Sequence, residues 1–327
     1  MSFSTNTAEA FEEAPREPVA PRVELTDAAR TGFGKGPLLA RHDLHENPLF
    51  SDASLADLLD AYPRDLLHAI ATGVDPEREE NRVAAHEGVS GRELLEAVKR
   101  GRLWLNVTRV SAVDRRFRDL IDGLYAQLAA QVPGFRPQES RGTLLVSSPR
   151  AVVYLHADGP PNILWHIRGR KKIWIYPALD ERFLPRTDLE DIFAGARHEY
   201  LPYRSDFDAH ATCYEMRPGD MATWPQNAPH RVTNLDTLNV SLSTEHFTSE
   251  SRARARVYAA NRFFRTRLGF THLSSRETGL GALAKSAVHG VARRLGLNID
   301  PGRAKQRLPT LRISASAPGG VVALTGR

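Results

Sequence analysis

Between Ala151 and Tyr176 the sequence reads AVVYLHADGPPNILWHIRGRKKIWIY, in which short runs of β-branched and aromatic residues alternate with Gly, Pro and Asp. Such runs indicate β-strands divided by turns. Many short strands with turn signals predict a β-sandwich or barrel and not a parallel sheet. The expected strands are Thr143–Ser147, Ala151–His156, Ile163–Ile167, Lys171–Tyr176, Thr212–Met216, Ala222–Trp224 and Leu238–Thr244.

Helical periodicity flanks this β-rich region on both sides. Before it, Ser90 and Glu93 have the spacing of a helix capping box. The first 30 residues are rich in Ala, Glu and Pro, lack a signal-peptide pattern and are expected to be disordered. The pattern predicts a disordered segment over 1–30, a helical region over 31–135, the β-barrel over 136–250, a second helical region over 251–310 and a tail over 311–327.

The composition is that of a soluble globular protein, with 41% hydrophobic and 25% charged residues. No apolar run is long enough to span a membrane. Cys213 is the only cysteine, so an internal disulfide or a thiolate cluster is impossible. This favours a reducing cytoplasmic location, and any metal site must use His and carboxylate ligands.

The strongest candidate site is the pair His156 and Asp158. Side chains two residues apart on a strand face the same side, so both can hold one ion. His230, which follows Pro229 and lies 74 residues after His156, is the best-placed third ligand on another strand. Two imidazoles and one carboxylate are the ligand set of non-haem Fe(II) oxygenases, which leaves coordination positions open for reactants. We therefore expect His156, Asp158 and His230 to bind Fe(II) and to be catalytic.

A basic residue opens the strand Lys171–Tyr176. If Ile173 and Ile175 point into the barrel, period two turns Lys171 inward as well and leaves Lys172 outside. A lysine inside a barrel needs an anion, and the distal carboxylate of 2-oxoglutarate would supply one. The alternative is that Lys171 is simply exposed at the end of the strand.

These residues together resemble a known family. Lys171 follows His156 by 15 residues and Asn162 follows it by 6, and the distal His230 completes the pattern. The combination is similar to the JmjC-type, cupin-like oxygenases that depend on Fe(II) and 2-oxoglutarate. Within them it is closest to the group of the hypoxia-inducible-factor asparaginyl hydroxylase. The resemblance covers about residues 100–247, including the stretches Ile167–Pro177 and Pro225–His230.

The resemblance implies a mainly β fold with flanking helices around a double-stranded β-helix, the cupin or jelly-roll core. It implies a 2-oxoglutarate-dependent dioxygenase, a hydroxylase, in which Lys171 and Asn162 contact the co-substrate. It also implies dimerisation through C-terminal helices. One position departs from the pattern, because Val153 stands where relatives often carry a co-substrate-binding threonine. Thr143, Tyr154, Ser241 and Ser243 are candidates to compensate for it.

Two other functions stay open at this point. One is a non-catalytic cupin-like module that regulates or binds a partner, and the other is a metal-dependent cupin enzyme that does not use 2-oxoglutarate. Cupin barrels host many functions, so the fold alone does not choose between them. The sequence does not indicate whether the substrate is a protein side chain or a small molecule.

The C-terminal region is both basic and amphipathic. Thirteen Lys or Arg residues lie between Arg252 and Arg307, against only Glu277 and Asp300. This charge could meet an anionic partner, whether nucleic acid, acidic protein or a lipid surface. The absence of a nucleic-acid-binding motif favours a solvated helical face instead. Apolar residues recur at helical spacing, and we expect them to be buried in a dimer interface or against the barrel. They form two stripes, Val257, Ala260, Phe264 and Leu268, and Leu280, Leu283, Ala284, Val288, Val291 and Leu295.

Overall fold

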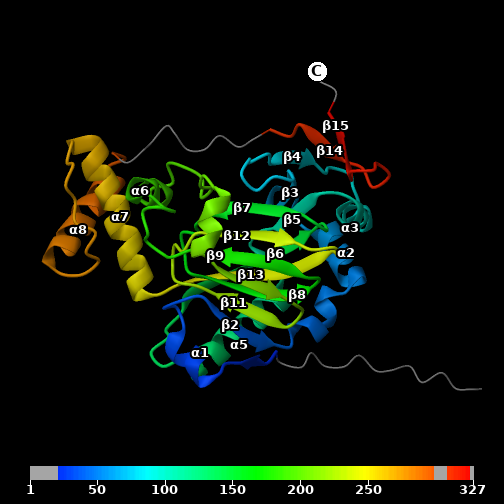
Figure 1. Ribbon diagram of the computed structural model, residues 1–327, viewed down its shortest axis with the longest axis horizontal. Helices are drawn as coiled ribbons and strands as arrows, with labels where there is room; N and C mark the ends of the chain where they lie inside the picture. Colours follow the sequence, from blue (N-terminus) through cyan, green and yellow to red (C-terminus); the bar gives the residue numbers. More distant parts are fainter. Residues whose placement is uncertain (1–20, 298–307, 325–327) are drawn as a thin grey trace, which may run out of the picture.

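The computed structural model describes residues 21–297 and 308–324, and two facing antiparallel sheets form its centre (Figure 1). The small sheet has the strand order β10 (Thr212–Met216), β9 (Lys171–Ile175), β12 (His230–Asn234) and β7 (Val152–His156). Opposite it, the large sheet contains β11 (Asp220–Thr223), β8 (Asn162–Arg168), β13 (Asn239–Phe247) and β6 (Gln138–Ser147).

From β6 to β13 the chain alternates between the two sheets, except that β9 and β10 are neighbours in the small sheet, and this is the connectivity of a double-stranded β-helix. The predicted fold class, mainly β with flanking helices around a jelly-roll core, is confirmed. A cluster of apolar side chains fills one part of the barrel interior. It contains Leu164, Ile173, Ile175, Met216, Ala222, Trp224, Ala228 and Val232.

The large sheet is wider than the barrel, because seven further strands extend it. Next to β11 lie β2 (Leu38–His42) and β1 (Val23–Glu24). Next to β6 lie β5 (Leu103–Val107), β3 (Leu67–Ala71), β4 (Arg82–Ala85), β14 (Leu311–Ile313) and β15 (Val321–Ala323).

These strands correct three expectations about the ends of the barrel. The region 31–135 is not purely helical, since it supplies β2 to β5. The region 311–324 is not a loose tail, because it forms the hairpin of β14 and β15 at the edge of the large sheet. In this hairpin Leu311 of β14 pairs in parallel with Ala84 of β4. Residues 21–30 of the expected disordered segment contain β1 and the start of a helix. Residues 1–20 of that segment and residues 325–327 of the expected tail lie outside the described residues.

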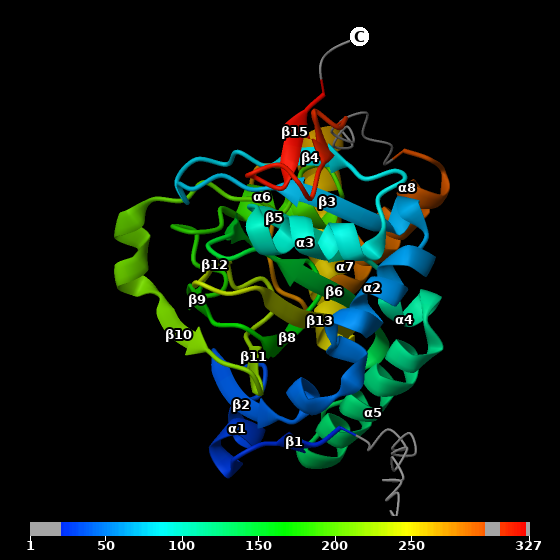
Figure 2. The ribbon, with the colours of Figure 1, turned by 90° about the vertical axis from the view of Figure 1, so that its right-hand side faces the viewer.

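Helices cover the outer face of the large sheet (Figure 2). The longest of them buries Phe117, Ile121 and Leu124 against sheet residues such as Leu144 and Leu242, as its spacing of three and four predicts. The helices of this region are α1 (Asp27–Gly32), α2 (Asp52–Ala61), α3 (Gly91–Arg100), α4 (Val110–Val113) and α5 (Arg115–Gln131), with short 3-10 turns at Leu44–Glu46, Pro48–Phe50 and Arg64–Leu66. The capping box expected at Ser90 and Glu93 starts α3.

Beyond the small sheet, α6 (Arg186–Phe193) and the 3-10 turn Ser205–His210 pack on its outer face, and α7 (Ser249–Leu268) runs beside α6. The last helix, α8 (Leu280–Arg294), packs on α7 and projects furthest from the barrel (Figure 1). No described helix is long and apolar enough to cross a bilayer.

The two apolar stripes of this region differ in their burial. Val257 and Ala260 of α7 are buried, whereas Leu268 is exposed. The stripe of α8 points to solvent, with Leu280 86% and Leu283 67% exposed. Packing of the α8 stripe against the barrel of the same chain is therefore wrong, and burial in a dimer stays a prediction. Residues 298–307 at the end of the expected helical region lie outside the described residues.

Candidate metal centre and cavity

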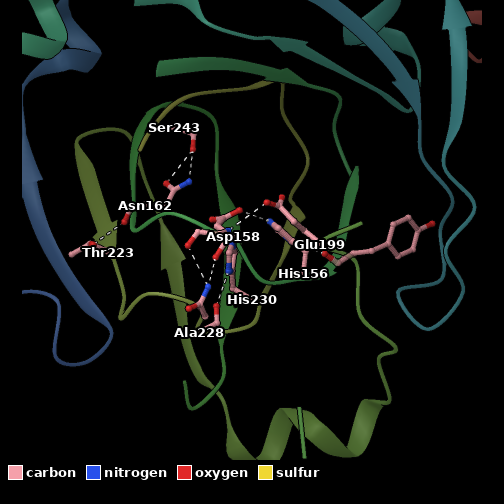
Figure 3. A network of polar contacts seen from close by, with 11 residues as sticks. His156, Asp158, Asn162, Glu199, Thr223, Ala228, His230 and Ser243 are labelled. Carbon is pink, nitrogen blue, oxygen red and sulfur yellow. Dashed lines mark hydrogen bonds and ion pairs between the residues drawn. The ribbon is translucent and has the colours of Figure 1, made fainter. Parts of the chain in front are cut away.

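The structure brings together the three side chains that the sequence singles out. His156 is the last residue of β7 and His230 is the first of β12, and the two are paired across the sheet. Asp158 lies in the turn just after β7. One ligand atom from each residue lies within 4.8 Å of the others. The Nε2 atoms of His156 and His230 lie 3.7 and 3.5 Å from the Asp158 carboxylate (Figure 3).

The orientation of both imidazoles is fixed by the backbone. His156 Nδ1 lies 2.8 Å from the carbonyl oxygen of Tyr154, and His230 Nδ1 lies 3.0 Å from that of Ala228. A carbonyl oxygen only accepts, so each Nδ1 must carry the proton. Each Nε2 then presents its lone pair to the centre of the group, which is the arrangement of metal-binding histidines.

The Asp158 carboxylate is buried without a sufficient partner. Its Oδ2 atom is fully enclosed and accepts no hydrogen bond from the described residues. Burial, together with the charge of Glu245, raises the pKa of Asp158 to about 6, although His156 acts in the opposite direction. A buried carboxylate of this kind is stabilised by a cation. The donor set and the orphaned oxygen therefore fit a divalent metal ion.

The turn that carries Asp158 is fixed by hydrogen bonds from the loop that precedes β12. Asn227 Nδ2 donates to the Asp158 carbonyl oxygen at 2.8 Å, and Gln226 Nε2 donates to that of Gly159 at 2.9 Å. Asn227 itself has a left-handed backbone, with φ 64°, a conformation that asparagine tolerates better than most residues. Sequence reasoning assigned no role to Gln226 and Asn227, although both lie within the Pro225–His230 stretch that it used.

A cavity of about 530 Å³ opens beside the three residues and reaches into the barrel. Lys171 lines it and is only 4% exposed, whereas Lys172 is half-buried, so the inward register predicted from period two is confirmed. Lys171 Nζ donates to Ser241 Oγ at 2.9 Å. Among the described residues no carboxylate forms an ion pair with Lys171, and burial lowers its pKa to about 7. This ammonium therefore lacks an anion.

The hydroxyl that holds Lys171 is itself fixed by a buried histidine. His166 Nε2 lies 3.0 Å from the Gly169 carbonyl oxygen and must donate to it. His166 Nδ1, 3.0 Å from Ser241 Oγ, then accepts from the hydroxyl. The lone pairs of the Ser241 hydroxyl are therefore free to accept from Lys171. The hydrogen bonds from Gly169 through His166 and Ser241 thus orient the Lys171 side chain.

Asn162, the first residue of β8, lines the same cavity. Its Nδ2 donates to Ser243 Oγ at 2.9 Å. Thr143, Ser243 and Val153 also line the cavity. Tyr154 does not, because its hydroxyl accepts from the backbone amides of Gly73 and Glu80. Thr143 and Ser243 are thus the hydroxyls available to replace the one missing at Val153, while Ser241 acts through Lys171.

Part of the cavity wall comes from a segment that the sequence did not indicate. Residues 199–201 run antiparallel to β7, since Ala157 N donates to the Glu199 carbonyl at 3.1 Å and Leu201 N to that of Leu155 at 2.8 Å. This pairing places the Glu199 and Tyr200 side chains in the cavity lining. The segment has neither strand nor helix periodicity, so no local signal marks it.

Comparisons with solved structures give matches of low identity. Solved structures that match include E. coli ycfD, with 16% identity, a TM-score of 0.48, and coverage of 86% of this chain and 70% of that one. A second is the ribosomal oxygenase YcfD from E. coli in complex with cobalt and 2-oxoglutarate, with 14% identity, a TM-score of 0.47, and coverage of 90% and 75%. A third, oxalate oxidase in complex with the substrate analogue glycolate, has 13% identity, a TM-score of 0.22, and coverage of 32% and 40%.

These TM-scores are too low for the matches to indicate what this chain binds or does, and no curated protein matches it. The comparisons do not single out the asparaginyl hydroxylase group, so that closer likeness stays a prediction. A family model described as a cupin-like domain matches residues 63–247, which is more than half of the chain. The chain therefore belongs to the cupin-like family.

Proposed function

We propose that the protein is an Fe(II)- and 2-oxoglutarate-dependent dioxygenase that hydroxylates a protein side chain or a small molecule. The observation that carries this proposal is one cavity with two complementary ends. At one end His156, Asp158 and His230 converge, and at the other a buried Lys171 has no carboxylate partner among the described residues. Such a cavity suits a dianion that chelates a metal at one end and meets a cation at the other.

His156, Asp158 and His230 would hold the metal. When bound, Fe(II) supplies the centre at which a 2-oxo acid and O₂ react. The contribution of the chain is to fix the ligands before the ion arrives, because both imidazoles are already oriented by the Tyr154 and Ala228 carbonyls. Pre-oriented ligands reduce the cost of binding a labile divalent ion.

Lys171 and Asn162 would hold 2-oxoglutarate. A buried ammonium is stabilised by a carboxylate, and Ser241 directs it while leaving further N–H groups for the ligand. The Asn162 amide can turn from Ser243 toward a ligand oxygen, because both side chains already line the cavity.

Two alternatives are disfavoured by particular contacts. A non-catalytic cupin-like module has no need of a buried carboxylate whose Oδ2 lacks a hydrogen bond, as in Asp158. A metal-dependent cupin enzyme without 2-oxoglutarate has no need of an unpaired buried lysine such as Lys171. Metal content and succinate release together separate all three, since only the proposed enzyme converts 2-oxoglutarate to succinate, and a metal-dependent cupin enzyme binds metal without doing so.

We also propose that the chain forms a homodimer through α8. The exposed stripe of Leu280, Leu283, Val288, Val291 and Leu295 runs along one side of this helix. Contiguous apolar surface of this kind usually marks an interaction site. A second copy would cover it by symmetry.

The lone Cys213 fits the cytoplasmic location that the sequence predicts, and a nucleic-acid partner is not proposed.

A further inference from the structure

Glu199 is a carboxylate beside the metal centre that the proposed chemistry does not use. It lines the same cavity as the triad, and its Oε1 accepts a hydrogen bond of 3.4 Å from the backbone amide of Gly159, next to Asp158 (Figure 3). Its backbone is fixed by the pairing of residues 199–201 with β7. The side chain is exposed, so a ligand in the cavity can reach it.

The other charges of the cavity are already balanced within the described part of the chain. Glu245 is paired with Arg141 at 2.6 Å, and Arg197 is paired with Asp188. Asp158 would be offset by the metal ion and Lys171 by the co-substrate. For Glu199, no Lys, Arg or His of residues 21–297 and 308–324 comes within ion-pairing distance. The Glu199 carboxyl group therefore remains without a cationic partner in the cavity that holds the triad.

The surroundings of Glu199 make this charge costly unless a cation joins it. Desolvation is the largest cause that raises the pKa of Glu199, to about 8. A bound cation would reverse this effect. Tyr200 and Trp224 line the same cavity, and aromatic faces favour ammonium and guanidinium groups.

A loop that contacts Tyr154, outside the cavity lining, is acidic as well. The loop 73–81 contains Asp75, Glu77, Glu79 and Glu80 against one arginine. The loop contacts the barrel through Tyr154, whose hydroxyl oxygen accepts a hydrogen bond of 3.2 Å from the Glu80 backbone amide. The centre of the Tyr154 ring lies 6.5 Å from that of Tyr200. Negative charge on the surface attracts a positively charged ligand and repels an anionic one.

We propose that Glu199 binds a positively charged group of the substrate, an ammonium or a guanidinium, and so selects a cationic substrate for the metal centre. This inference rests on the oxygenase function proposed above, but Glu199 is not needed to hold the metal or 2-oxoglutarate. It is a specificity residue, and its effect is on substrate binding.

The test measures binding and not turnover. The full chain is loaded with Fe(II) and 2-oxoglutarate without O₂, and a parallel sample is kept metal-free. Saturation-transfer NMR then compares N-acetyl-arginine methylamide and N-acetyl-lysine methylamide with neutral analogues made from citrulline and norleucine. Butylguanidinium, which has no peptide groups, shows whether a small cation is sufficient or a peptide is needed. We expect each cationic amide to bind at least about tenfold more tightly than its neutral analogue.

Glu199→Gln should remove this preference, whereas Glu199→Asp, which keeps the charge, should retain part of it. Glu215→Gln is the matched control, because Glu215 pairs with Arg170 away from the cavity. Equal binding of cationic and neutral probes, no binding of any probe, or an unchanged preference in the folded E199Q variant would overturn the proposal. The proposed oxygenase function is tested separately by succinate release: its failure leaves these binding results intact, and the reverse also holds.

Discussion

At the scale of single residues, the triad makes a direct prediction about metal binding. His156→Ala or Asp158→Ala should weaken Fe(II) binding by more than about a hundredfold, because each lost donor also leaves the remaining ligands less fixed. His198→Ala is the control, since His198 lines the same cavity outside the triad. Metal content after dialysis is the measurement. If both triad variants kept full metal content, the triad would not be the metal site.

Substitution of Lys171 is expected to weaken the binding of 2-oxoglutarate and not the binding of the metal. Truncating one partner of a buried charged contact costs roughly 2–5 kcal/mol, so Lys171→Ala should weaken 2-oxoglutarate binding at least about thirtyfold. Lys172→Ala should have little effect, because Lys172 is half-buried on the other side of β9. Calorimetric titration of both metal-loaded variants decides the matter. Similar affinities in the two would mean that the ammonium of Lys171 does not face 2-oxoglutarate.

The same lysine predicts how 2-oxoglutarate binding depends on pH. In the free protein, burial lowers the pKa of Lys171 to about 7, whereas a bound carboxylate would raise it again. Protonated Lys171 binds the dianion, so affinity should be highest below pH 7 and fall by up to about tenfold per pH unit above it. Calorimetry of the metal-saturated protein across this range measures the slope. A constant affinity would contradict the assignment, and Lys171→Ala should bind weakly without a slope.

At the scale of elements, α8 carries the prediction about assembly. Burying each Leu of its stripe in a dimer would contribute roughly 1.5–3 kcal/mol. Leu283→Glu together with Val291→Glu should therefore yield monomers, as measured by sedimentation velocity. Arg294→Glu, also on the exposed surface of α8, should leave the dimer intact. A wild-type chain that sediments as a monomer at micromolar concentration would show that something else covers the stripe.

The elements also show what a sequence pattern can and cannot predict. Alternation located seven of the eight barrel strands, all but β12, and turned Lys171 inward, because period two acts within one strand. It missed β14 and β15, which are three residues each and exist only through pairing with β4. It predicted an apolar face on α8 but not what covers it, since periodicity carries no information about the partner. It also missed Glu199, whose position depends on the pairing of an irregular segment with β7.

At the scale of the whole molecule, the fold explains why residues far apart in sequence meet at one cavity. Strands β7, β9 and β12 of the small sheet supply His156, Lys171 and His230, and β8 of the large sheet supplies Asn162. The seven strands and the helices outside the barrel enlarge the large sheet and cover its outer face. The cavity consequently lies between rigid walls, which is where a preorganised site is most precise.

The measurement that tests the central claim most directly is succinate formation from 2-oxoglutarate by the Fe(II)-loaded chain in air. The wild-type protein should produce succinate slowly even without its substrate, and addition of the substrate should accelerate it. Asp158→Ala and Lys171→Ala should both reduce this rate to that of free Fe(II) in buffer, while Lys172→Ala should match the wild type. Succinate at the background level from wild-type protein with full metal content would contradict the oxygenase function.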